Sequence, residues 1–442
     1  MRSSTCAIAT RSSCGYPKRI SGRRRTSDRR VREMAAPQIV TGLDIGTTKV
    51  SAVVAEIGGG GAFAIRGLGE SPSSGLRQGN LIHLESTVEA VRHALGQAEQ
   101  MAGTSIRGVY ASIAGDHIRS INSRGVIAIS GRDNEVTRED IDRVVEAARA
   151  VAIPSNRAIL HVIPQEFIVD DQTGITDPVG MSGVRLEAEV HIITASATAV
   201  RNVIKCIERA GYRVDELVAE PLASSWAVLE EDERRLGVVL LDIGAGTTDV
   251  AVHFDGGLHH TAVISMGGAQ ITNDIAIGLR TPLEAAEQIK IEHGCAYSAM
   301  LRGDEKIAIP GVGGREARSL SLHVLAAIIE PRVEEILTLA REEVARLQGS
   351  EVLAAGIVIT GGCAGLRGVG ELAEQVFEMP ARLGVPLDVA GIGDLTAEPR
   401  HATGVGLTRY GASWTRQAAG GAHRMRGSRV RDWLRARVPF LG

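Results

Sequence analysis

The sequence GLDIGTTK at residues 42–49 returns, with small changes, as LDIGAGTTD at residues 241–249. Each copy reads as a strand that ends in aspartate, then a glycine turn, two threonines and a second strand. Glycine lets successive backbone N–H groups approach phosphate oxygens without interference from a Cβ atom. Carboxylates at the strand ends suit a hydrated Mg²⁺, which prefers a few carboxylates with water and phosphate oxygens. One such turn is weak evidence, but two copies indicate an internal duplication with a phosphate site.

The sequence IVITGG at residues 357–362 adds a third glycine turn, at the end of a buried strand. A glycine pair there lets an adenine ring lie against the backbone, and a plain turn is the alternative. On a predicted helix, Glu287 and Lys290 offer a carboxylate and an ammonium to ribose and base, or form a solvated face. His161 and His191 alternate with apolar strand residues, which favours structural roles.

Composition limits the class of protein. The chain has 442 residues, of which 44% are hydrophobic, and this length suits about two to four domains. No run of about 18 apolar residues occurs, so an ordinary transmembrane helix is excluded. The 5 cysteines form no metal or disulfide pattern, which indicates a reducing compartment. Walker A and Rossmann patterns are absent.

Charge is unevenly distributed along the chain. Residues 1–36 carry +8 and residues 416–442 carry +6, which leaves residues 37–415 at −17 within the total of −3. An acidic body with basic ends does not fit a nucleic-acid binder, so we expect no nucleic-acid partner. Residues 1–36 predict a disordered basic extension. They are interpreted as an over-extended start before Met34, with a transit peptide or a nucleic-acid-binding arm as alternatives.

Hydrophobic periodicity predicts alternating strands and helices. The block at about 118–198 differs, because it reads strand, helix, strand, strand, with a helix that begins at Thr137 and is capped through Asp140. It therefore predicts a small inserted α+β domain. The predicted strands are at 39–45, 49–57, 63–69, 109–113, 126–130, 158–169, 186–194, 356–360 and, within 236–254, a repeat of the opening hairpin; the predicted helices are at 84–102, 137–151, 200–211, 283–293, 320–348 and 369–377.

The C-terminal segment has its own character. Residues 413–427 predict a flexible linker, and residues 428–442 predict an amphipathic helix for an anionic lipid surface. Arg437 would have to snorkel from the apolar sector, and Pro439 would end the helix. A disordered basic tail is the alternative. The residues predicted to meet the membrane are Val430, Arg431, Trp433, Leu434, Arg435 and Val438.

Taken together, the three turns and the motif AEPLAS at 219–224 resemble the actin/Hsp70/sugar-kinase superfamily. Within it, residues 38–412 resemble the FtsA family of bacterial cell-division proteins. The motifs that carry this resemblance are SIAGDHI at 112–118, LHVIPQEF at 160–167, DPVGMSGVRL at 177–186, KCIERAG at 205–211 and AEQVF at 373–377.

The resemblance implies an α/β, actin-like fold (ribonuclease H-like and duplicated) with two lobes around an ATP site. The implied domains are a first lobe at 37–117 and 199–235, an insert at 118–198, a second lobe core at 236–269 and 329–412, and a variable subdomain at 270–328.

The resemblance also implies roles for single residues, with ATP and Mg²⁺ as cofactors. Asp44 and Asp242 would face the metal, Glu220 would orient the attacking water, and Asp249 is a second carboxylate for acid/base work. The residues implied for phosphate and nucleoside are Gly46, Thr47, Thr48, Lys49, Gly244, Ala245, Gly246, Thr247, Thr248, Glu287, Lys290, Gly361 and Gly362.

Finally, the resemblance implies a cellular role. The protein would bind ATP, with weak turnover if any, and polymerise on the cytoplasmic face of the inner membrane at the division septum. Its partners would be FtsZ, later divisome proteins, further copies of itself and anionic lipid. The alternatives are a PilM-like pilus-assembly adaptor, and a soluble kinase or chaperone ATPase of the superfamily.

Overall fold

The computed structural model describes residues 38–58, 62–314, 316–347 and 353–419. Contacts divide the chain into a unit at Met1–Ala36 and a unit at Pro37–Gly442. The first unit, for which we expected a disordered extension, lies outside the described residues.

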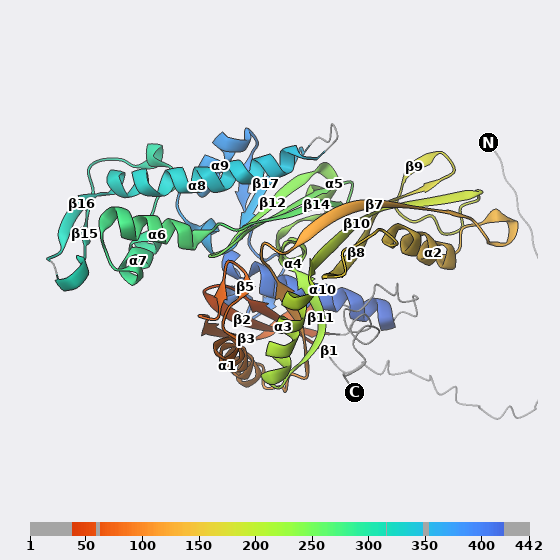
Figure 1. Ribbon diagram of the computed structural model, residues 1–442, viewed down its shortest axis with the longest axis horizontal. Helices are drawn as coiled ribbons and strands as arrows, with labels where there is room; N and C mark the ends of the chain where they lie inside the picture. Colours follow the sequence, from red (N-terminus) through yellow and green to blue (C-terminus); the bar gives the residue numbers. More distant parts are fainter. Residues whose placement is uncertain (1–37, 59–61, 315, 348–352, 420–442) are drawn as a thin grey trace, which may run out of the picture. The chain divides into compact units, whose positions relative to one another are not determined.

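A six-stranded sheet forms the first lobe, in the order β11-β6-β1-β2-β3-β19 (Figure 1). Strands β1 and β2 form the predicted antiparallel hairpin, and β6 runs parallel to β1. The expected helix at 84–102 is present with the same bounds. The elements of this lobe are β1 (Gln38–Ile45), β2 (Lys49–Ile57), β3 (Phe63–Pro72), β6 (Gly108–Ile113), β11 (Arg213–Ala219), β19 (Ala390–Gly391), α1 (Leu84–Ala102), α3 (Ala197–Arg209), α4 (Glu220–Val228) and α10 (Ala402–Ala419), with the short hairpin β4 (Leu76–Arg77) and β5 (Asn80–Leu81).

A five-stranded sheet, in the order β14-β13-β12-β17-β18, forms the second lobe. Its centre repeats the first sheet, because β12 and β13 form an antiparallel hairpin and β17 runs parallel to β12. The duplication inferred from the two glycine turns is therefore present in the fold. The elements here are β12 (Val238–Ile243), β13 (Thr248–Phe254), β14 (Gly257–Ile264), β17 (Gly356–Thr360), β18 (Ala381–Leu383), α5 (Glu231–Leu236), α6 (Gly268–Leu279), α7 (Leu283–His293), α8 (Leu322–Ala345) and α9 (Val369–Phe377), with the hairpin β15 (Lys306–Ile309) and β16 (Arg318–Ser321).

Strand β12 is buried on both faces, as central strands of such sheets are. Its alternate residues enter different cores, with Leu240 in the core shared with the first lobe and Leu241 in the core under α6 and α8. The second glycine turn therefore follows a strand that is packed on both faces.

The inserted domain is a four-stranded sheet, in the order β7-β10-β8-β9, with α2 packed against it (Figure 1). Thr137 and Asp140 form the predicted capping box of α2. Gly125 is required here, because a Cβ atom would overlap the backbone of α2. The elements are β7 (Arg119–Ala128), β8 (Arg157–Val169), β9 (Gln172–Ile175), β10 (Arg185–Ser196) and α2 (Arg138–Arg149).

Several bounds differ from the sequence predictions. The strand predicted at 126–130 ends at Ala128 and begins at Arg119, because polar residues on its solvent face conceal the alternation. Strands β9, β11 and β14 and helices α6 and α10 were missed; β9 and β14 are short or polar, and α6 and α10 have glycines within them.

The second-lobe assignment of 329–412 was wrong at its end. Strand β19 pairs with β3 of the first sheet, and Val405 and Leu407 of α10 join the first-lobe core. Helix α10 also continues to Ala419, so the first part of the linker predicted at 413–427 is helical. The rest of that linker lies outside the described residues.

Candidate functional site

The two glycine turns close with the same backbone hydrogen bond. Gly46 N–H donates to the carbonyl of Lys49 at 2.9 Å, and Gly244 N–H donates to the carbonyl of Thr247 at 2.9 Å. The turns also meet, because a Cβ atom at Gly246 would overlap the Thr47 hydroxyl oxygen. The structure thus brings together two segments that the sequence separates by about 200 residues.

Two aspartates at the strand ends are held by hydroxyl groups. Asp44 Oδ1 accepts a hydrogen bond from Ser112 Oγ at 2.9 Å. Asp242 Oδ2 accepts hydrogen bonds from Ser224 and, at 3.2 Å, from Thr403 Oγ1. Both carboxylates are buried, so these bonds fix their direction while leaving oxygen lone pairs for a further ligand.

Glu220 and Asp249 complete a group of four acidic side chains. Glu220 is the first residue of α4, and its carboxyl group lies beside those of Asp44 and Asp249. Asp249 lies on β13, directly opposite Asp242. The residues predicted to handle the metal and the attacking water therefore lie in one cluster.

Burial raises the pKa of all four carboxyl groups. Loss of solvent raises the pKa of Asp249 to about 8, and the charge of Asp242 adds to the rise. Burial likewise raises the pKa of Asp242 to about 6. The pKa of Glu220 is raised well above its usual value by burial and then by Asp249, and that of Asp44 is raised by burial. Like charges packed this closely favour a bound cation or retained protons.

The cluster fits a hydrated Mg²⁺ better than a directly ligated metal. Among the described residues, no group of three or more His, Cys, Asp or Glu side chains is arranged to hold a metal ion. Mg²⁺ keeps several waters and needs only one or two carboxylates beside phosphate oxygens. Asp249 Oδ1 is buried without a hydrogen-bond partner in the described part of the chain. A cation or one of its waters would satisfy this oxygen.

The third glycine turn, at Gly361, contacts this cluster of carboxyl groups. Gly361 has φ +88°, and a Cβ atom there would overlap Asp242 Oδ1. Next to it, Gly362 faces open space. Glycine is thus required at one position by geometry, while the other leaves backbone accessible for a flat ring.

Glu287 and Lys290 lie together on α7, against the start of α6. Lys290 Nζ donates to Glu287 Oε2 at 2.7 Å, to Thr272 Oγ1 at 2.8 Å and to the carbonyl of Gly268 at 3.1 Å. Gly268 N–H in turn donates to the carbonyl of Gly244 at 2.9 Å. The predicted nucleoside pair is therefore tied to the second turn, although Lys290 already has three partners.

The remaining predicted residues differ in position. Thr47 and Ala245 lie on the touching turns, Thr48 is exposed, and Thr247 and Thr248 are buried. Thr248 Oγ1 donates to the carbonyl of Met266 at 2.8 Å. Lys49 lies beside the first turn, but its ammonium pairs with Glu70 at 2.6 Å.

Comparison with known proteins decides the family. Residues 239–406 match the model for "Cell division protein FtsA", and residues 115–194 match the model for "SHS2 domain inserted in FTSA". The cell division protein FtsA of Pseudomonas aeruginosa is 48% identical over 374 residues, covering 85% of this chain and 89% of that protein. The chain belongs to the FtsA family. Its function is accordingly that of an actin-like cell-division protein.

A more distant FtsA protein agrees with this assignment, and solved structures bear on the fold. FtsA of Bacillus subtilis is 40% identical over 373 residues, covering 84% of this chain and 83% of that one. The PilM–PilN type IV pilus biogenesis complex has a TM-score of 0.61 at 19% identity, covering 84% of this chain and 98% of that chain. MreB5 of Spiroplasma citri bound to ADP has a TM-score of 0.54 at 13% identity, covering 87% and 99%. These structures confirm the actin-like fold, and the SHS2 match confirms the inserted domain.

Sequence reasoning missed several residues of the candidate site. Ser112 and Ser224 were inside quoted motifs, but their bonds to the aspartates were not foreseen. Thr403 and His401 had no sequence signal, because they belong to the missed return of the chain at α10. Gln78 was also missed; its amide donates to the carbonyl of Ser265 at 3.0 Å.

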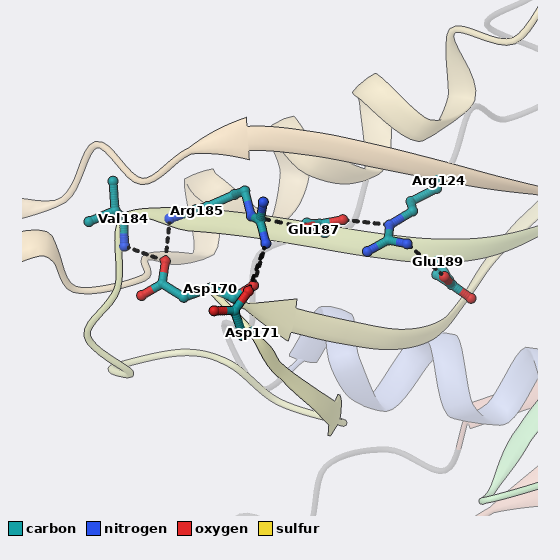
Figure 2. Close-up of polar contacts among 7 residues, drawn as sticks. All are labelled: Arg124, Asp170, Asp171, Val184, Arg185, Glu187 and Glu189. Carbon is teal, nitrogen blue, oxygen red and sulfur yellow. Dashed lines mark hydrogen bonds and ion pairs between the residues drawn. The ribbon is translucent and has the colours of Figure 1, made fainter.

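The insert carries a second polar feature (Figure 2). Glu187, almost fully buried, is paired with Arg124 on one side and with Arg185 at 3.0 Å on the other. Asp170 and Asp171 extend the row beyond Arg185. Since alternate residues of β10 pack against α2, this row lies on the sheet face away from that helix.

The predicted membrane residues from Val430 to Val438 lie outside the described residues. In the part of the chain that the structure describes, no helix has the length and hydropathy of a membrane span.

Proposed function

We propose that this FtsA-family protein binds ATP with Mg²⁺, polymerises on the cytoplasmic membrane at the septum, tethers the FtsZ ring and helps recruit later divisome proteins. The observation that carries the proposal is the meeting of two glycine turns over four carboxylates, in a chain of this family. MreB5 of Spiroplasma citri, which has a similar fold, was solved bound to ADP, and this supports nucleotide binding by the fold.

Each residue has a defined task in the proposed site. The turns at Gly46–Lys49 and 244–248 present backbone N–H groups and threonine hydroxyls to the phosphates. Asp44 and Asp242 would hold a hydrated Mg²⁺ through its waters, and the cation would supply charge neutralisation to the phosphates. Gly361, Gly362, Glu287 and Lys290 line the nucleoside.

Glu220 and Asp249 are suited to orient a water against the terminal phosphate. Glu220 retains some solvent exposure, and its neighbouring carboxylates make it a better proton acceptor than an ordinary glutamate. Burial and like charge raise the pKa of both carboxyl groups, and we expect ATP binding to be the main event, with weak turnover if any.

The variable subdomain offers a surface for FtsZ. Five exposed apolar side chains occur there, and a pocket of about 560 Å³ is lined by Arg302 and Arg367 among others. Exposed apolar side chains suit apolar residues of a partner segment, and the arginines of the pocket suit acidic ones. The five are Ile277, Leu283, Ile291, Val312 and Val324.

Membrane attachment rests on the C-terminal sequence. Each arginine near an anionic surface contributes about 1 kcal/mol to the binding free energy, and a few apolar side chains add to it. The conformational entropy lost when the tail becomes ordered opposes both contributions. One tail therefore binds weakly, whereas a row of tails on a filament binds strongly through effective concentration. The insert, with its charged row, is the proposed contact surface for later division proteins.

A PilM-like pilus adaptor is the second candidate. The PilM–PilN structure has a similar fold, but at 19% identity the likeness extends only to the fold. The basic tail with Trp433 is not expected for such an adaptor.

Flotation on anionic liposomes with ATP tests the proposal. The full chain is compared with Trp433→Glu/Leu434→Glu and with Trp433→Leu as the apolar control, with and without FtsZ. A chain truncated for the same comparison should end after Ala419, because α10 runs to that residue. We expect the full chain and the apolar control to float and carry FtsZ, and the Glu variant to stay behind. Equal flotation of all three would place lipid binding in the body, and no flotation with no FtsZ capture would overturn the proposed membrane tether.

A further inference from the structure

Lys49, a predicted phosphate ligand, is held by another residue in this structure. Its Nζ donates to Glu70 Oε1 at 2.6 Å, and the two side chains are 25% and 33% exposed. Lys49 is the first residue of β2, directly after the first turn, whereas Glu70 lies on the neighbouring strand β3. The ammonium is therefore close to the turn but engaged with a carboxylate.

A buried histidine lies behind that carboxylate. His401, at the end of the 3-10 helix Pro399–His401, has a fully buried side chain with Nδ1 at 3.7 Å from Glu70 Oε1. Within the described residues, neither of its ring nitrogens has a hydrogen-bond partner. Burial lowers the pKa of His401 to about 4, so the ring is neutral and carries one N–H donor. An unsatisfied buried donor is costly, and the Glu70 carboxylate lies 3.7 Å from His401 Nδ1.

We infer that Glu70 is a positioning residue that competes with phosphate for Lys49, and that His401 satisfies Glu70 once Lys49 has left. The inference rests on the proposed nucleotide site. When a phosphate oxygen arrives, Lys49 Nζ gives up its bond to Glu70 Oε1 and donates to the phosphate. A small shift then lets the His401 ring N–H donate to the released carboxylate. Each charged group keeps a partner, and no covalent bond changes.

The segment that contains His401 also contacts groups at the other glycine turns. Pro399, in the same short helix, accepts a hydrogen bond from Gly361 N–H of the third turn at 3.3 Å. Thr403, two residues after His401, bonds to Asp242 below the second turn. The segment 399–403 thus contacts the surroundings of all three turns, and it starts helix α10.

A double-mutant cycle measured by calorimetric titration of the full chain with Mg-ATP tests the competition. A partly exposed ion pair contributes up to about 1 kcal/mol, so we expect Glu70→Gln to bind ATP about threefold to fivefold more tightly. Lys49→Met should bind about tenfold more weakly, since it loses a charged contact to phosphate. In the Lys49→Met background, Glu70→Gln should have no effect.

The role of His401 is tested in the same way. His401→Leu removes the N–H donor and should weaken ATP binding about threefold, whereas His401→Gln, which keeps a donor, should restore it. The loss should vanish in the Lys49→Met background, which a merely structural effect of position 401 would not do. Thermal midpoints of all variants show which of them fold.

The outcomes separate the two proposals. Unchanged or weaker ATP binding by Glu70→Gln, or additive effects of the Lys49 and Glu70 variants, would overturn the exchange while leaving the nucleotide site in place. A wild-type chain that does not bind ATP at all would overturn the proposed function and the exchange with it.

Discussion

Gly246 approaches Thr47 so closely that any side chain at position 246 would overlap the Thr47 hydroxyl group. The two residues lie on turns from the two halves of the duplicated fold, at β12–β13 and β1–β2. Their contact is what joins two separate glycine hairpins into one candidate phosphate site.

Gly246→Val should weaken Mg-ATP binding at least about tenfold, because its side chain would separate the turns and also press on the backbone of Gln78. Titration calorimetry measures the affinity. Gly96→Ala is the matched control, since Gly96 lies in α1 with open space at its Cβ position. Wild-type affinity in Gly246→Val would show that the turns do not bind phosphate together.

Gly361→Ala and Gly362→Ala should separate stability from binding at adjacent residues. The first places a Cβ atom at φ +88° against Asp242 and should lower the free energy of unfolding by about 1–3 kcal/mol. The second has open space and should leave stability almost unchanged, while lowering ATP affinity if the base lies there. Denaturant unfolding and ATP titration distinguish them, and equal stability of both variants would contradict the geometry.

Asp249→Asn should stabilise the nucleotide-free protein and weaken its Mg-ATP binding. The folded-state pKa of Asp249 is raised to about 8, so the folded protein retains a proton there that the unfolded chain loses at about pH 4. The stability of the folded protein therefore falls as pH rises from about 4 to 8. Removing the charge should add at least about 1 kcal/mol at pH 7.5. Unfolding midpoints at pH 5 and 7.5 measure this change, and a lower midpoint for the variant at pH 7.5 would contradict it.

His253→Leu should protect the protein against acid. Burial lowers the pKa of His253 to about 3, and Arg234 and neighbouring histidines add to the decrease. The unfolded state then binds the extra proton between about pH 6.5 and 3, so stability is lost as pH falls through that window. One such histidine costs about 2 kcal/mol at pH 5.

Denaturant midpoints at pH 7.5 and pH 5 measure the acid effect. The fall between the two values should be smaller in His253→Leu than in the wild type. His323→Leu, at an exposed position, is the control and should keep the wild-type fall. An equal decrease of the midpoint in all three proteins would show that burial of His253 does not cause the loss of stability in acid.

The sequence alone determined the features that depend on local pattern. Both glycine hairpins, the third turn, helix α1 and the insert with its capping box follow from alternation, helical spacing and turn residues within short windows. The carboxylates of Asp44 and Asp242 were predicted for the same reason, since each directly precedes a glycine turn.

Only the tertiary structure decided which distant groups complete the site. Ser112 holds Asp44 across 68 positions, and Thr403 holds Asp242 across 161 positions. The pairing of Lys49 with Glu70 and the burial of His401 likewise depend on how β3 and α10 pack beside the turns. Such partners are set by long-range packing and desolvation, which leave no periodic trace in the sequence.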